Sequence, residues 1–219
     1  MSLYEHMKKG LIILIFGILI YSCSSTKVGN GKTKYYNEKG ESISKDKYYQ
    51  KFRSGNFSTF ISDATNNYRL AEKIESGSIT NKRKFDSILL KELSEKYNPS
   101  LPSVFIFYPG KDDCNSANNR VNYNPIRNKY FSDLEKGLDE ICKHNIFYIY
   151  KNKTGLNDGN KGFKKWHSDP NEIFERLFFK RHYICGSYVI VSKDAKYISE
   201  FGEYSKENIW KYIKFLEKL

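Results

Sequence analysis

Cysteine offers the most chemistry in this chain, and Cys114 has the most informative surroundings of its four cysteines. It follows Lys111, Asp112 and Asp113, directly after an apolar run at residues 104–108. The carboxyl end of a buried strand is where open α/β sheets keep their reactive groups, and a thiolate there can be a nucleophile or a metal ligand. Two neighbouring carboxylates disfavour a thiolate, and one lysine offsets only part of that effect. An attacking Cys114 is therefore not favoured.

Metal binding is a second chemistry that these residue types permit. His182 and Cys185, with Cys114 and Asp113, could supply imidazole and sulfur ligands for copper or zinc. A histidine near a helix end, as we expect His182 to be, more often interacts with the helix dipole. The sequence also contains no phosphate-binding glycine loop, no serine–histidine–acid set and no nucleic-acid motif. We therefore predict no metal, no cofactor and no nucleic-acid partner.

The elements that position Cys114 begin with the strand before it. Residues 104–108 are continuously apolar between Pro102 and Pro109, which is typical of a strand covered on both faces. A helix is expected from Asn124, with proline at its first position and an apolar stripe that includes Cys142. Residues 146–150 then form a second apolar strand, so strand, helix and strand make a parallel crossover.

The second half of the chain continues this alternation. Asp169 and Pro170 predict the start of the next helix, after a long loop. Residues 188–191 and 196–201 are typical of a β-hairpin around a four-residue turn. Ser205 then caps a closing amphipathic helix. The predicted order over residues 101–219 is strand, helix, strand, helix, strand, strand, helix.

This βαβαββα order resembles the thioredoxin fold, and residues 187–216 follow its C-terminal half element by element. The resemblance implies an α/β three-layer sandwich. In that family a Cys-x-x-Cys motif follows the first strand and a cis-proline loop precedes the hairpin. Here no second cysteine lies within three residues of Cys114, and residues 184–187 lack proline. These departures count against a conventional dithiol–disulfide oxidoreductase.

The same resemblance places Cys114 and Cys185 in loops that face each other. In an oxidising location they would form a structural disulfide, which is the arrangement we favour. Two unpaired thiols and a redox-active pair are the alternatives.

Residues 35–100 are expected to form an N-terminal α+β extension that packs on the main domain. The pattern indicates two short strands around Gly40, a short helix capped by Ser44 and an edge strand within residues 56–62. A longer helix is predicted from the cap Thr80. So few apolar residues would be marginal as an independent domain.

The N-terminus carries an export signal. Two lysines precede an apolar run at residues 11–20, which would span only about 15 Å as a helix, so residues 1–22 are predicted to be a signal peptide rather than a membrane-spanning helix. The following Ser22 and Cys23 resemble the cleavage box of bacterial lipoproteins. That resemblance implies a lipidated Cys23, a flexible tether over residues 23–34 and a membrane anchor. An ordinary secretory signal is the alternative.

The predicted function combines these features. We expect a protein of the bacterial cell envelope, lipid-anchored through Cys23 and facing the periplasm or the exterior, whose thioredoxin-like domain is a non-catalytic binding or structural module for an envelope protein or glycan. The alternative is a thiol oxidoreductase or peroxidase-like protein that uses Cys114 with Cys185. A second alternative is a polyanion-binding surface protein, because the net charge is +12. The lysines are scattered, however, which is typical of a solubilising surface.

Overall fold

The structure is a computed structural model, and it describes residues 33–62, 67–93, 96–112, 114–115, 123–156 and 164–218. The predicted signal peptide, Cys23 and most of the predicted tether lie outside the described residues, as does Asp113. Within the described part of the chain, no helix is both long and apolar enough to cross a membrane.

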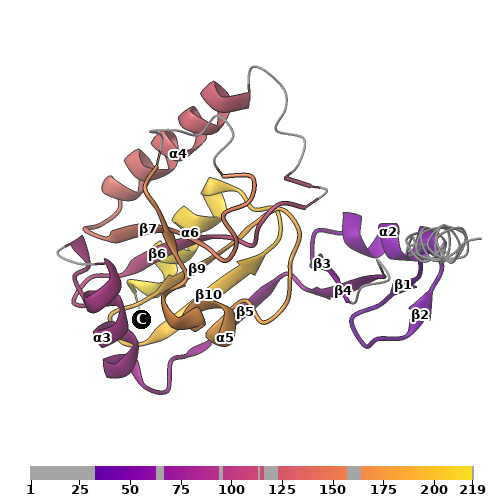
Figure 1. Cartoon of the computed structure of the whole chain (residues 1–219), viewed down its shortest axis with the longest axis horizontal. Coiled ribbons are helices and arrows are strands. Elements are labelled where there is room, and N and C mark those ends of the chain that lie inside the picture. Colours follow the sequence, from indigo (N-terminus) through magenta and orange to yellow (C-terminus); the bar gives the residue numbers. More distant parts are fainter. Residues whose placement is uncertain are drawn as a thin grey trace, which may run out of the picture. The chain divides into compact units, whose positions relative to one another are not determined.

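The N-terminal elements build a four-stranded sheet of order β2-β1-β4-β3 (Figure 1). Its strands are β1 (Tyr35–Tyr36), β2 (Ser42–Ile43), β3 (Phe57–Ile61) and β4 (Tyr68–Glu72), and helix α2 (Lys45–Arg53) lies between β2 and β3 in the chain. The expected cap is confirmed, since the Ser44 side chain accepts a hydrogen bond from the backbone N–H of Lys47 at 3.3 Å. The predicted strand within residues 56–62 is also confirmed as β3, at the edge of this sheet.

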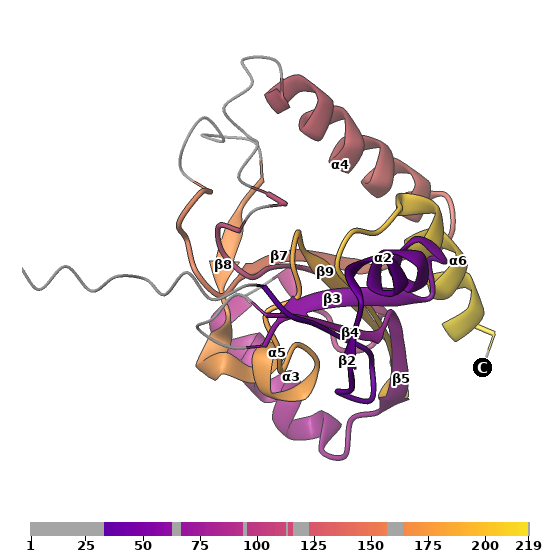
Figure 2. The same cartoon turned by 90° about the vertical axis from the view of Figure 1, so that its right-hand side faces the viewer.

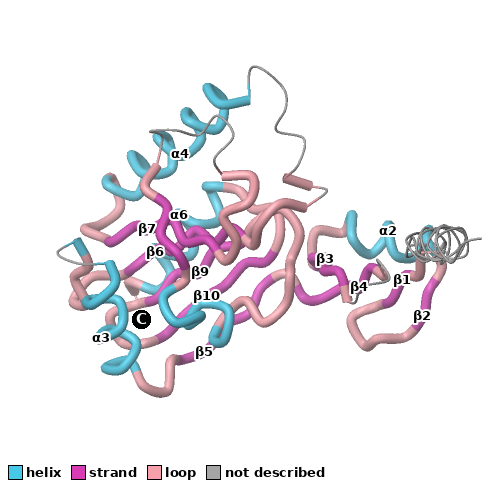
Figure 3. Tube along the Cα trace, viewed as in Figure 1, coloured by secondary structure: helices cyan, strands magenta, loops and turns pink. Residues whose placement is uncertain are grey.

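A six-stranded sheet of order β5-β10-β9-β6-β7-β8 forms the centre of the remaining chain (Figure 3). Its strands are β5 (Ile74–Ser78), β6 (Ser103–Tyr108), β7 (Asn145–Tyr150), β8 (Trp166–Ser168), β9 (Ser187–Val191) and β10 (Lys196–Phe201). All six residues of β6 are buried, as predicted for a strand covered on both faces. β6 pairs parallel with β7 and antiparallel with β9.

Helices cover both faces of this sheet (Figure 2). The helical segments are α3 (Lys82–Leu93), α4 (Tyr123–Asp139), the 3₁₀ turn η3 (Pro170–Glu172), α5 (Ile173–Leu177) and α6 (Lys206–Leu216). Phe105 and Phe107 of β6 belong to an apolar cluster with α3 and α5, whereas Val104 and Ile106 belong to a second cluster with α4 and α6. Because successive side chains of β6 point to opposite faces of the sheet, this strand contributes to both apolar cores. The predicted α/β class is confirmed.

Several boundaries differ from the sequence predictions. The helix expected to be capped by Thr80 begins at Lys82, because the side-chain oxygen of Asn81 accepts the hydrogen bond from the Lys84 N–H at 3.0 Å. The loop predicted after β7 contains the short strand β8, which pairs parallel with β7. Helix α4 ends at Asp139, so Cys142 follows the helix, half-buried beside the second cluster. Strands β4 and β5 carried too little apolar alternation to be predicted.

Candidate functional site: two loops joined by a disulfide

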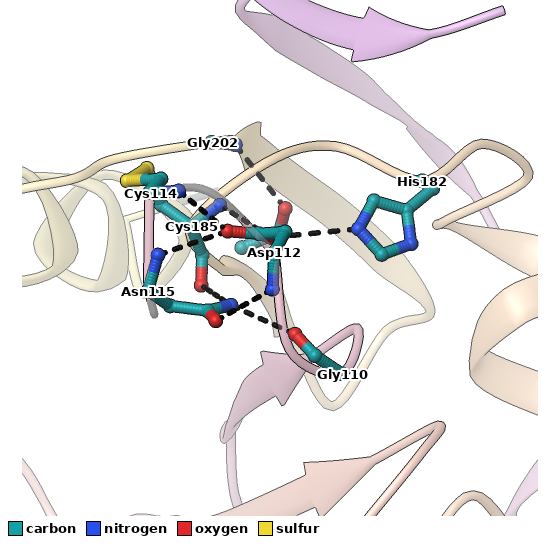
Figure 4. The surroundings of a disulfide bond; sticks show 8 residues. Gly110, Asp112, Cys114, Asn115, His182, Cys185 and Gly202 are labelled. Carbon is teal, nitrogen blue, oxygen red and sulfur yellow. Dashed lines mark hydrogen bonds and ion pairs between the residues drawn. A yellow bond between two sulfur atoms is a disulfide. The ribbon is translucent and has the colours of Figure 1, made fainter. Parts of the chain in front are cut away.

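The candidate site lies where the loop after β6 meets the loop before β9. A disulfide joins Cys114 of the first loop to Cys185 of the second, with their Cα atoms 5.0 Å apart (Figure 4). Because β6 and β9 are antiparallel neighbours, the C-terminal end of β6 and the N-terminal end of β9 lie side by side at the same end of the sheet. In this structure the two cysteines are therefore bonded to each other and are not two unpaired thiols.

Asp112 organises the backbone of both cysteines. One carboxylate oxygen accepts hydrogen bonds from the N–H groups of Cys114 at 3.0 Å and Asn115 at 2.9 Å. The other accepts the N–H of Cys185 at 3.0 Å, across to the second loop. The Asp112 side chain is only 3% exposed, and a buried carboxylate is tolerated when such donors surround it. Sequence reasoning used Asp112 only as a neighbouring charge and missed this role.

Asn115 makes a second set of bonds between the loops. Its side-chain oxygen accepts the Asp112 N–H at 2.8 Å, and its amide nitrogen donates to the carbonyl of Gly110 at 2.8 Å and of Cys185 at 3.3 Å. Asp112 and Asn115 thus bond to each other's backbone, which is the turn chemistry that an Asp and an Asn three residues apart can provide. The three-residue spacing of Asp112 and Asn115 was the signal in the sequence that could have predicted this turn.

The loop before β9 follows a constrained path. Cys185 has φ +79°, a left-handed conformation that is uncommon for residues other than glycine. At the next position, a Cβ on Gly186 would lie 3.3 Å from the carbonyl oxygen of Phe107, so the loop passes close to β6. The bond from Cys185 N–H to Asp112 supports the unusual backbone, so the site is held by more than the sulfur bridge.

His182 approaches Asp112 from the side away from the disulfide (Figure 4). Its Nε2 lies 3.4 Å from a carboxylate oxygen of Asp112, and the two form an ion pair when the imidazole is protonated. Of the metal set considered from the sequence, Cys114 and Cys185 share a disulfide, so neither offers a thiolate ligand, and Asp113 lies outside the described residues. Among the residues that the structure describes, no cluster of three or more His, Cys, Asp or Glu side chains could hold a metal ion.

The disulfide is accessible, but its described surroundings do not activate it. Cys114 is exposed and Cys185 is partly exposed. The charge next to their backbone is the Asp112 carboxylate, and it occupies both cysteine N–H groups, so neither is free to stabilise a thiolate. In the described part of the chain, helix α4 begins at Tyr123, nine positions after Cys114 in the sequence. The geometry suits a stable cross-link better than a leaving thiolate.

The structure thus brings together the two cysteines that the sequence selected and adds Asp112 and Asn115 as the groups that hold them. Cys142 is a half-buried free thiol, and burial raises its pKa. Comparisons of the chain with protein-family models, with curated proteins and with solved structures found no match.

Proposed function

We propose that the protein is a lipid-anchored component of the bacterial cell envelope, whose thioredoxin-like domain is a non-catalytic binding or structural module cross-linked by Cys114 and Cys185. The order of elements supports the thioredoxin-like assignment. With the short strand β8 and the turn η3 between β7 and α5 set aside, the elements β6, α4, β7, α5, β9, β10 and α6 have the order βαβαββα. Fold alone does not carry an activity, so the functional part of the proposal rests on the cysteine site.

The observation that carries the non-catalytic assignment is the position of the Asp112 carboxylate. Reduction of the disulfide creates thiols whose ionised forms this buried negative charge opposes. At the same time, the carboxylate binds the backbone of both loops, so the bridge reinforces an arrangement that already has its own hydrogen bonds. A disulfide of this kind suits an exported protein in an oxidising compartment.

The anchor is tested by metabolic labelling of bacteria that express the full chain. With radiolabelled palmitate we expect label on the wild-type protein and on Cys142→Ala, and none on Cys23→Ala. The matched Cys142 variant shows that the loss is specific to the predicted site. Labelled Cys23→Ala protein, or unlabelled wild-type protein, would refute the lipid anchor.

The structural role of the bridge is tested by unfolding the oxidised protein and the double variant Cys114→Ser/Cys185→Ser in urea. The cysteines are 71 positions apart, and the chain-entropy model gives a loss of about 4 kcal/mol when a loop of that length is opened. Cys142→Ser is the control and is expected to change stability much less. A loss below about 1 kcal/mol would show that the bridge does not stabilise the fold.

Thiol–disulfide exchange is the second candidate function, because Cys114 is exposed and open to attack. A substrate thiolate would attack the Cys114 sulfur and displace Cys185 as a thiolate, and the second substrate thiol would then release Cys114, leaving an oxidised substrate and a reduced protein. We expect no catalysed oxidation of a dithiol peptide by the wild-type protein. Turnover that persists in Cys142→Ser but disappears in Cys114→Ser and Cys185→Ser would replace the non-catalytic proposal with this one.

A further inference from the structure

Among the described residues, no segment pairs with the outer side of strand β5, which forms one edge of the six-stranded sheet. It pairs with β10 on one side and ends the strand order, and all five of its residues are exposed. Proteins usually protect such an edge with proline, lysine, a bulge or a covering segment, because its free N–H and C=O groups can pair with another strand. The sequence from Ile74 to Ser78 has neither proline nor lysine, and its register with β10 is continuous.

The hydrogen bonds at the two ends of β5 show which residues face outward. The N–H of Phe201 donates to the carbonyl of Lys73 at 2.8 Å, and the N–H of Ile79 donates to the carbonyl of Ala195 at 2.8 Å. Backbone groups alternate in direction along an antiparallel strand, so residues 75 and 77 also face β10. The backbone groups of Ile74, Ser76 and Ser78 therefore point away from the sheet.

An apolar cavity borders this edge on the face covered by α6. Its volume is about 340 Å³, and both Ile74 and Ser78 line it. The other lining residues are Ser76, Gly77, Lys196, Tyr197, Ile198, Tyr212, Phe215 and Leu216. Ile74 and Phe215 are 41% and 53% exposed, so the edge combines unpaired backbone with apolar surface.

We propose that β5 pairs antiparallel with β5 of a second copy of this chain, about a two-fold axis at Ser76, to give one continuous sheet. In that register Ser76 lies opposite Ser76, and Ile74 of each copy lies opposite Ser78 of the other. Residues directly opposite share a face of the sheet, so each Ile74 lies at the Ser78 end of the other copy's cavity. A two-fold interface requires this kind of reciprocal fit.

This reciprocity favours a second copy over an unrelated strand. The same strand supplies both the apolar side chain, Ile74, and the cavity that receives Ile74 of the other copy. The residue on the two-fold axis, Ser76, is small and uncharged. On the opposite face of the sheet, Gly77 has no side chain, and the Tyr197 ring occupies the space above it. A Cβ on Gly77 would lie 2.8 Å from the hydroxyl oxygen of Tyr197. Glu75, the only charge in β5, accepts the Tyr197 hydroxyl at 3.0 Å. Two copies therefore meet without like charges directly opposite each other.

A cysteine on the proposed axis tests the register. Directly opposed residues of a hydrogen-bonded antiparallel pair have Cα atoms about 5.5 Å apart, within the range that a disulfide spans. Full-length Ser76→Cys, purified in detergent and oxidised, is expected to form a covalent dimer on a non-reducing gel. The wild-type protein controls for its own cysteines, and Ser100→Cys, at another exposed position, controls for random collision. Equal dimer in both cysteine variants would overturn the register.

A lysine at the same position tests the interface without any cross-link. Two lysines facing each other on the axis repel, so Ser76→Lys is expected to sediment as a monomer, whereas wild type and Ser100→Lys sediment as dimers. Because Ser76 is exposed and its backbone points outward, the variant should keep the wild-type circular dichroism. The experiment uses about 100 μM protein, far above the dissociation constant of a stable dimer. A monomeric wild-type protein or a dimeric Ser76→Lys would refute the proposal. A monomeric wild-type protein is also the result expected if a different protein occupies this edge.

Discussion

Two buried carboxylates anchor two regions of this molecule in different ways. Asp112, beside the disulfide, is bonded by backbone N–H groups of two loops. Glu200 of β10 is completely buried and is bonded by side chains: the Tyr188 hydroxyl at 2.6 Å, the Asn208 amide at 3.0 and 3.1 Å, and the Lys73 ammonium at 3.1 Å. The first carboxylate fixes the backbone of two neighbouring loops, whereas the second joins the side chains of a strand, a helix and a connecting segment.

The difference lies in what each carboxylate holds. Tyr188 belongs to β9, Asn208 to α6, and Lys73 is the residue between β4 and β5, so Glu200 links the six-stranded sheet to a helix and to the strand that continues into the other sheet. Burial, and then the nearby Glu200 charge, raise the pKa of the Tyr188 hydroxyl, which stays a proton donor. Removal of Glu200 would leave the buried Tyr188 hydroxyl and the partly exposed Lys73 and Asn208 side chains without this acceptor, and that is costly.

Among the buried carboxylates, the largest effect is expected for Glu200→Gln. The amide keeps one acceptor oxygen but turns a donor toward groups that already donate, and it leaves the Lys73 charge unpaired. We expect the free energy of unfolding in urea to fall by about 3 kcal/mol. Glu203→Gln, an exposed glutamate two positions from β10, is the matched control and should change it little. Equal effects of the two variants would show that the Glu200 network does not stabilise the fold.

A smaller effect is expected for Asp112→Asn. The asparagine oxygen can still accept two N–H groups of its own loop, while its NH₂ faces the N–H of Cys185. The loss of this one charge-assisted bond should cost about 2 kcal/mol in the urea experiment. Asp194→Asn, in the exposed turn between β9 and β10, serves as control. If Asp112→Asn cost as much as Glu200→Gln, the distinction between a carboxylate that binds loop backbone and one that joins side chains of separate elements would fail.

The smallest effect concerns Asp169, a third carboxylate that binds backbone groups. It accepts the N–H of Phe174 at 3.0 Å and of Glu175 at 2.9 Å, yet burial raises its pKa from 3.8 to about 6. Between pH 4 and 6 the folded state therefore binds more protons than the unfolded state, so stability from this group falls as pH rises through that window.

The measurement compares urea unfolding of the wild-type protein and Asp169→Asn at pH 4, 5, 6 and 7. The stability of wild type relative to the variant should decrease from pH 4 to 7, because asparagine does not titrate and other groups cancel in the difference. A constant difference, or one that increases with pH, would show that the hydrogen bonds to the helix outweigh burial.

Much of the fold could be predicted, because its signals are local. The apolar run of β6, the Ser44 and Ser205 caps and the β9–β10 hairpin depend on neighbouring residues, and each is confirmed. β5 could not be predicted in the same way. Its sequence has one apolar residue, Ile74, and it becomes a strand only because β10 offers a free edge at the matching register.

For the candidate site, the amino-acid sequence by itself determined the strand that ends beside Cys114 and the absence of a nearby second cysteine. The resemblance to the thioredoxin fold added the expectation that Cys185 lies in a facing loop. The tertiary structure decided what surrounds the two cysteines. Asp112 became buried and bonded to both backbones, and Asn115 joined it, because the backbone N–H and C=O groups of Cys185, some 70 positions away, came within 3.5 Å of them. Such contacts depend on where β6 and β9 end in space, and no local pattern of residues encodes that distance.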